Sequence, residues 1–191
     1  MAQDRFPPLS SEQMTPEQKA YSESIAKPPR NANYRNPPYA VYIRSPKLAD
    51  KVEALSDYVR WNTEQPARLT ELAIIITARH WTSRWIWRSH YRLAVKGGLD
   101  PKVGADIAAG KRPDTMKEDE AILYDYAMQL YRDNRVTDEM FAKAKAQFGE
   151  RGLIDLVAAM GYYDLVAKTL MTAYANPPKE ADVPELLPLT R

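Results

Sequence analysis

The chain has 191 residues, of which 45% are hydrophobic and 27% charged, as is typical of one globular domain. Its 27 basic and 25 acidic residues nearly balance, so the sequence lacks the cationic character expected of a nucleic-acid-binding domain. It contains no cysteine and only two histidines, which excludes disulfides and thiolate metal sites within these residues and disfavours a histidine-rich metal site. We therefore expect neither a metal nor another cofactor.

Proline residues divide the N-terminal part of the chain into short segments. Residues 1–10 are predicted to form an extended arm. Thr15 is a suitable N-cap and Pro16 a favoured first residue, so a helix is predicted to run to about Ala26. The stretch 28–43 is rich in proline, asparagine and tyrosine and is predicted to be a loop.

The rest of the chain shows helical periodicity nearly throughout. One helix begins at Ser45-Pro46, and another is capped by Thr82 or Ser83 and ends at Gly97-Gly98. Further helices are predicted over residues 67–80, 100–110, 117–133, 137–148 and 153–174. The fold class is therefore all-α, with about eight helices.

The chain divides into an N-terminal arm, helix and loop (1–44), a helical domain (45–175) and a Pro-rich C-terminal tail (176–191). We expect the arm and the tail either to lie over a neighbouring subunit or to be disordered. Helix 153–174 is apolar around most of its circumference, so it is either central in the domain or shared with a subunit interface. No stretch approaches the about 20 apolar residues of a membrane-spanning helix, and the N-terminus lacks the apolar core of a signal peptide. A cytoplasmic protein with no membrane partner is expected.

A histidine and a glutamate stand among apolar residues on two successive helices. Side chains project about 100° apart around a helix, so Ile86, Trp87 and His90 share one face with Ser83. Glu71 lies within the apolar helix 67–80, where a carboxylate is costly to bury without a partner. The pattern predicts a Glu71–His90 pair, an arrangement used in general acid–base catalysis. The alternatives are a hydrogen-bonded core histidine, a purely structural salt bridge between the two residues, and a surface glutamate in the first turn of its helix.

The segment "ELAIIITARHWTSRWIWRSHYRLAVKGGL" (71–99) and the later segment "VTDEMFAKAKAQFGERGLIDLVAAMGYYDLVAKTLM" (136–171) carry a family resemblance. In their order and spacing, over roughly residues 37–175, the chain resembles the carboxymuconolactone decarboxylase/AhpD-like superfamily. The resemblance implies an AhpD-like helical bundle that assembles as a homo-oligomer, a trimer or a hexamer.

The resemblance also implies roles for individual residues. The AhpD-type hydroperoxidases use a glutamate, a Cys-x-x-Cys pair and a histidine, which match Glu71, Ser83, Ile86 and His90. A serine and an isoleucine cannot cycle through a disulfide, so peroxidase activity of that type is excluded. The decarboxylase branch needs no cysteine, but it has an acidic residue four positions before the histidine, where this chain has Ile86.

The sequence therefore predicts a decarboxylase-like enzyme acting on a small carboxylate, lactone or aromatic-derived carbonyl compound. His90 is the expected general acid/base and Glu71 its partner, and the alternative is a non-catalytic or binding descendant of the hydroperoxidase fold. The candidate substrate-binding residues are Arg79, Trp87, Ser83, Arg84 and Tyr39. For Trp87 the alternative is core packing, and for Arg79 it is a surface position beside a capping turn.

Overall fold

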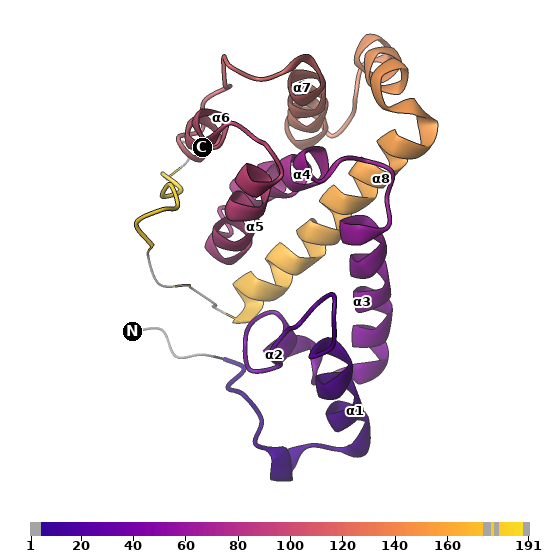
Figure 1. Ribbon diagram of the computed structural model, residues 1–191, viewed down its shortest axis with the longest axis vertical. Coiled ribbons are helices and arrows are strands. Elements are labelled where there is room, and N and C mark those ends of the chain that lie inside the picture. Colours follow the sequence, from indigo (N-terminus) through magenta and orange to yellow (C-terminus); the bar gives the residue numbers. More distant parts are fainter. Residues whose placement is uncertain (1–4, 174–176, 178–179, 189–191) are drawn as a thin grey trace.

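The computed structural model describes residues 5–173, 177 and 180–188. Regular secondary structure within these residues is helical throughout, as the sequence predicts (Figure 1). A 3₁₀ turn at Ser11–Gln13 is followed by eight α-helices: α1 (Pro16–Ile25), α2 (Tyr39–Tyr42), α3 (Pro46–Trp61), α4 (Ala67–His80), α5 (Arg84–Lys96), α6 (Pro101–Ala108), α7 (Glu118–Asp133) and α8 (Asp138–Ala173).

Helix α1 begins at the cap that its sequence predicts. At the start of α1, the Thr15 side chain accepts a hydrogen bond from the Gln18 backbone N–H, and Pro16 occupies the first turn. Helix α5 differs from its prediction in detail. Ser83 occupies the N-cap position, but its side chain makes no capping hydrogen bond, and Thr82 lies in the turn with a φ of 51°.

Helix α8 contains the two C-terminal helices that the sequence predicts, joined without a loop. They meet at Gly149, whose φ of 70° and ψ of 170° interrupt the helical backbone. A β-carbon at this position would meet no atom within 4 Å, so the positive φ, and not crowding, accounts for the glycine.

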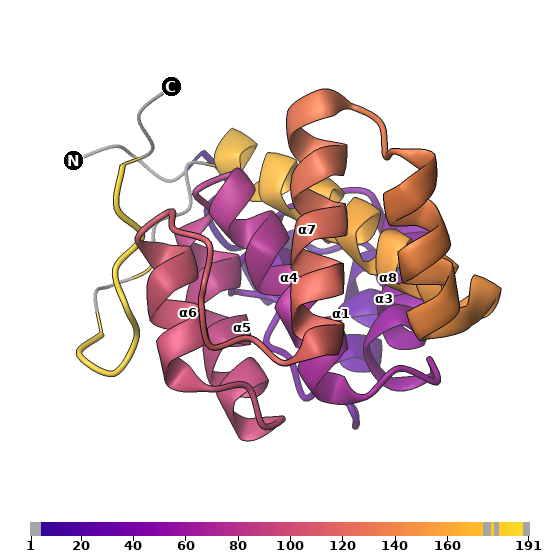
Figure 2. The same cartoon turned by 90° about the horizontal axis from the view of Figure 1, so that it is seen from above.

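The core is built around α4. Its residues Leu72, Ile74 and Ile75 are fully buried, and the helix packs against α5, α7 and α8 (Figures 1 and 2). The C-terminal half of α8 crosses the molecule beside α4 and buries Leu156 and Met160, so the prediction of a central helix is confirmed. No helix among the described residues has both the length and the apolar character required to cross a membrane.

The N-terminal elements α1, α2 and α3 lie together at one end of the molecule (Figure 1). The loop after α1 is attached to α3 through Arg30, which forms an ion pair with Glu53 at 2.5 Å and donates a 3.2 Å hydrogen bond to Ser56. The described part of the arm contacts its own chain, because the Tyr34 hydroxyl donates to the Leu9 carbonyl. The attachment of this loop forms one wall of the site described below.

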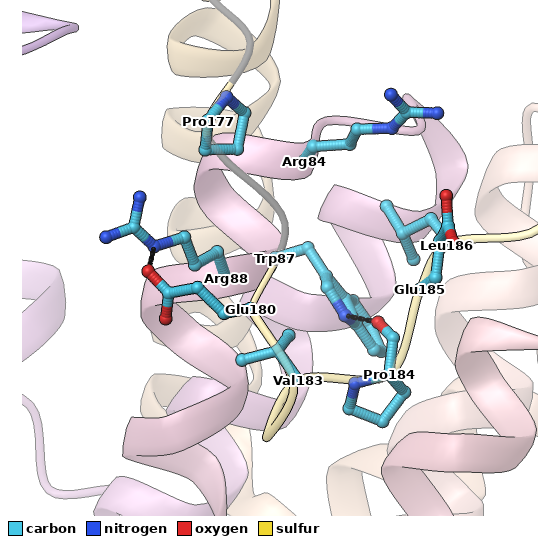
Figure 3. Close-up of a pocket in the computed structure, with 9 residues that line it drawn as sticks. All are labelled: Arg84, Trp87, Arg88, Pro177, Glu180, Val183, Pro184, Glu185 and Leu186. Atoms are coloured by element: carbon cyan, nitrogen blue, oxygen red, sulfur yellow. Dashed lines mark hydrogen bonds and ion pairs between the residues drawn. The ribbon is translucent and has the colours of Figure 1, made fainter.

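The expectation that the C-terminal tail is disordered or lies on another subunit is wrong for residues 180–188. This part of the tail lies beside Trp87 of α5 (Figure 3), and the Leu187 backbone N–H donates to the Ala108 carbonyl at the end of α6. The Trp87 indole donates a 2.7 Å hydrogen bond to the Pro184 carbonyl, and Leu186 is only 3% exposed. Backbone, aromatic and apolar contacts thus make this segment part of the fold. Most of the remainder of 176–191, like residues 1–4, lies outside the described residues.

Candidate functional site

Glu71 and His90 form a direct pair between α4 and α5. The Glu71 Oε2 atom lies 2.6 Å from His90 Nδ1, and both residues are buried. Because a carboxylate can only accept, Nδ1 carries the proton and donates it into this hydrogen bond. The pairing predicted from the sequence is confirmed, and the alternative of a surface glutamate is wrong.

The second ring nitrogen of His90 faces an open space. Nε2 has no hydrogen-bond partner among the described residues, and it is not sealed from solvent as the buried unpartnered atoms are. The Tyr163 ring meets the imidazole edge-on, with ring centroids 4.7 Å apart. Burial raises the pKa of Tyr163 well above its usual value, so this phenol stays neutral beside the histidine.

A cavity of about 380 Å³ lies beside His90. Residues from α2, α3, α5 and α8 and from the loop before α2 surround it, so its walls come from parts of the chain that are far apart in the sequence. Its lining residues are Arg30, Asn31, Ala32, Asn33, Asn36, Pro37, Pro38, Tyr39, Ser56, Arg60, Trp85, Ile86, Ser89, His90, Leu93, Tyr162, Tyr163, Val166 and Leu170. The volume falls within the usual range for small-molecule sites.

The cavity wall combines aromatic surface with hydrogen-bond donors. Tyr39, Trp85 and Tyr162 supply broad aromatic faces, while Arg30 and Arg60 supply guanidinium groups. Such a lining, with many polar groups beside the aromatic side chains, suits a small organic molecule that carries a polar group. Among the described residues, no group of three or more His, Asp or Glu side chains is arranged to hold a metal ion.

Tyr39 is the only one of the five predicted substrate-binding residues that lines this described cavity. Trp87 and Arg84 instead line a smaller cavity of about 120 Å³ between α5 and the tail (Figure 3). Trp87 is buried and hydrogen-bonded to the tail, in agreement with the packing alternative. The structure therefore does not bring Trp87 or Arg84 to the His90 cavity.

Arg79 and Ser83 are also placed away from the cavity lining. Arg79 is only 6% exposed, which overturns the alternative of a surface arginine, and its Nη2 atom donates a 2.5 Å hydrogen bond to the Leu187 carbonyl. Burial lowers the pKa of this guanidinium. Ser83 is buried at the start of α5, where its backbone N–H donates to the Ala78 carbonyl.

Sequence reasoning did not identify Arg30, Arg60 or the asparagines of the loop as cavity residues. Arg60 stands in the last turn of α3, where a basic residue has an ordinary explanation in the helix dipole. Arg30 belongs to a Pro- and Asn-rich stretch with no periodicity to orient it. The only available signal was the density of polar and aromatic residues in 28–43.

A comparison with solved structures shows the fold. A crystal structure of a protein of unknown function from Agrobacterium tumefaciens, described as a candidate AhpD antioxidant defence protein, superposes with a TM-score of 0.65. The match covers 73% of this chain and 97% of that chain, at 16% sequence identity. No protein-family model matches the chain, and no curated protein does so either. The chain therefore has an AhpD-like fold, and it carries that fold without any cysteine.

Proposed function

We propose that the protein is a carboxymuconolactone decarboxylase-like enzyme in which His90 acts as a general acid/base. The observation that supports this most directly is the buried 2.6 Å Glu71–His90 pair at the edge of a cavity. Glu71 holds the proton on Nδ1, which leaves Nε2 as the atom that exchanges a proton with a molecule in the cavity. Glu71 acts through His90 and is therefore a positioning residue.

The chemistry requires a substrate that can hold the electrons released at carbon. In an unsaturated lactone that bears a carboxylate, the carbon–carbon bond to the carboxylate breaks and carbon dioxide leaves. The electron pair stays on the substrate as an enolate of the lactone carbonyl. Protonated His90 then donates its Nε2 proton to the substrate carbon, and the imidazole regains a proton from water. The reaction consumes one proton and needs no oxidant or reductant.

Two assays test this function. The first measures carbon dioxide release from unsaturated carboxylactones, and the second follows exchange of hydrogen for deuterium next to the carbonyl of a small lactone in D₂O by NMR. We expect the wild-type protein to catalyse at least one of these reactions and His90→Gln to lose about 100- to 10,000-fold in rate. A folded His90→Gln variant that works at the wild-type rate would refute the role of His90.

A second candidate function is non-catalytic binding on the same scaffold. The specific observation in its favour is Ile86, which lines the cavity where the decarboxylase branch has an acidic residue and the hydroperoxidases have a cysteine. Binding of small molecules in the cavity, with neither carbon dioxide release nor deuterium exchange, supports this alternative.

A further inference from the structure

Arg60 brings an unpaired positive charge to the His90 cavity. Its guanidinium lies over the Trp61 ring, 4.4 Å from the ring centroid, and makes no hydrogen bond or ion pair with any described residue. The other arginine in the lining, Arg30, is bound to Glu53 and Asp57. Arg60 is therefore the lining guanidinium that remains available to a ligand.

Two hydrogen-bond donors in the cavity wall lack acceptors. The Nε atom of Arg60 and the indole Nε1 of Trp85 are both buried without a hydrogen-bond partner among the described residues, and they belong to two different helices, α3 and α5. A buried N–H group without an acceptor lowers the stability of the folded protein, and most buried N–H groups are therefore hydrogen-bonded. Because these two atoms are sealed from solvent, a ligand reaches Arg60 through its two Nη atoms, which are not among the buried unpartnered atoms.

The charges around the cavity favour an anion. None of the lining residues in the described part of the chain is an aspartate or a glutamate. The acids behind the wall are already engaged: Glu53 binds Arg30 and accepts a 3.0 Å hydrogen bond from the Tyr21 hydroxyl, and Glu71 binds His90. Arg60, whose charge also acts on Glu53, forms no ion pair with an acid among the described residues and can pair with an anion inside the cavity.

The lining of the cavity favours a molecule that contains a ring. Tyr39, Trp85 and Tyr162 contribute aromatic side chains, and Val166 and Leu170 of α8 add aliphatic surface. Planar rings gain from stacking or edge contacts with such side chains beyond the burial of area alone. An aromatic ring of benzene size fits a volume of about 380 Å³ with room for substituents.

From these observations we infer that the cavity binds an aromatic carboxylate, with its carboxylate on Arg60 and its ring between the aromatic walls. A guanidinium binds a carboxylate through two parallel hydrogen bonds, which fixes the orientation of the ring. The inference rests on the proposed function only for the role of His90 toward the bound molecule. The binding itself depends on Arg60.

Calorimetric titration with benzoate and benzamide tests the inference, because the two molecules share a shape and differ in charge. The wild-type protein is expected to bind benzoate at least 10-fold more tightly than benzamide. Arg60→Gln is expected to weaken benzoate binding about 10- to 100-fold and to change benzamide binding less than 3-fold. Lys51→Gln removes an exposed positive charge from the same helix and is the matched control, for which no change is expected.

A further variant separates the effect of the Arg60 charge from the effect of its planar geometry. Arg60→Lys retains the charge without the planar fork and is expected to give an intermediate affinity for benzoate. Absence of benzoate binding, equal affinity of the wild-type protein for benzamide, or normal benzoate binding by Arg60→Gln would each overturn the inference. The comparison of benzoate with benzamide on the wild-type protein tests the inference even when a variant does not fold. A wild-type protein that binds benzoate through Arg60 but catalyses neither carbon dioxide release nor deuterium exchange would refute the proposed function alone.

Discussion

His90 Nδ1 lies 2.6 Å from Glu71 Oε2, and this contact joins two helices that are consecutive in the chain. Glu71 projects from α4 toward α5, and the turn at Trp81–Ser83 reverses the chain so that the two side chains meet. The pair is buried on one side, and the cavity opens on the other side of the imidazole. A carboxylate placed in this way fixes one tautomer of the histidine and orients its free nitrogen.

A double-mutant cycle on this pair tests whether Glu71 acts through His90. We expect Glu71→Gln alone to lower the rate of the deuterium-exchange or decarboxylation reaction at least 10-fold, because an amide orients the ring without stabilising the protonated imidazole. The double variant Glu71→Gln/His90→Gln is expected to be no slower than His90→Gln alone, since residues that act as a unit are not additive. Additive losses would assign Glu71 an independent role. Thermal melts of the three variants separate these effects from unfolding.

The sequence determines the helices well because their ends carry local signals. The Asp100 side chain caps α6 and Pro101 stands in its first turn, while α4 begins directly after Pro66, which provides no side-chain cap. The short helix α2 was missed because four residues in a Pro-rich stretch give too little periodicity to recognise. Residue spacing also predicted the Glu71–His90 pair, since each residue is a polar group within an apolar face.

The rest of the site depends on packing that periodicity does not report. Trp87 lies about 60° from His90 around α5, which is close enough to share an apolar face on a helical projection. In the structure that face is divided: Ile86, Ser89 and Leu93 turn toward the cavity, while Trp87 turns toward the tail. The positions of α8 and of the tail determine which side chains of α5 line the cavity and which contact the tail.

The ion pair between Arg68 and Asp119 predicts a loss of stability in acid. Asp119 Oδ2 lies 2.6 Å from Arg68 Nη2, and this hydrogen bond lowers the pKa of the carboxyl below its usual value. A lowered pKa in the folded state means stabilisation that is present above the unfolded pKa of about 3.9 and lost as the pH falls through the folded value. Asp119→Asn is expected to cost about 1–2 kcal/mol at pH 7, and the difference from wild type should shrink below about pH 4.

Urea unfolding at pH 3, 5 and 7 measures this dependence. Asp133→Asn removes a similar contact to Arg132, but that pair is fully exposed, so no measurable change is expected at any of the three pH values. A constant difference between Asp119→Asn and wild type across the pH range would contradict the prediction.

The contact of Tyr58 with Asp155 joins α3 to α8. The Tyr58 hydroxyl donates a 3.0 Å hydrogen bond to Asp155 Oδ1, while Oδ2 of the same buried carboxylate has no hydrogen-bond partner. Tyr58→Phe leaves both oxygens of the carboxylate without a hydrogen-bond donor among the described residues, and we expect a loss of about 1–3 kcal/mol in the free energy of unfolding. Tyr124→Phe removes a long 3.5 Å hydrogen bond to the Lys111 carbonyl and serves as the control, with an expected change below about 0.5 kcal/mol. Equal losses in the two variants would show that the buried carboxylate is satisfied in another way.

Two adjacent leucines test whether the tail is part of the folded unit. Leu186 is 3% exposed and Leu187 is 50% exposed, so the same substitution has a buried and an exposed version one residue apart. Leu186→Ala is expected to cost about 2 kcal/mol or more through lost burial and the space left behind, up to the limit set by detachment of the tail. Leu187→Ala keeps the backbone contacts to Ala108 and Arg79 and is expected to change stability by less than about 0.5 kcal/mol. Denaturant unfolding of both variants decides the matter, because a tail that does not pack on its own chain would make the two substitutions equally harmless.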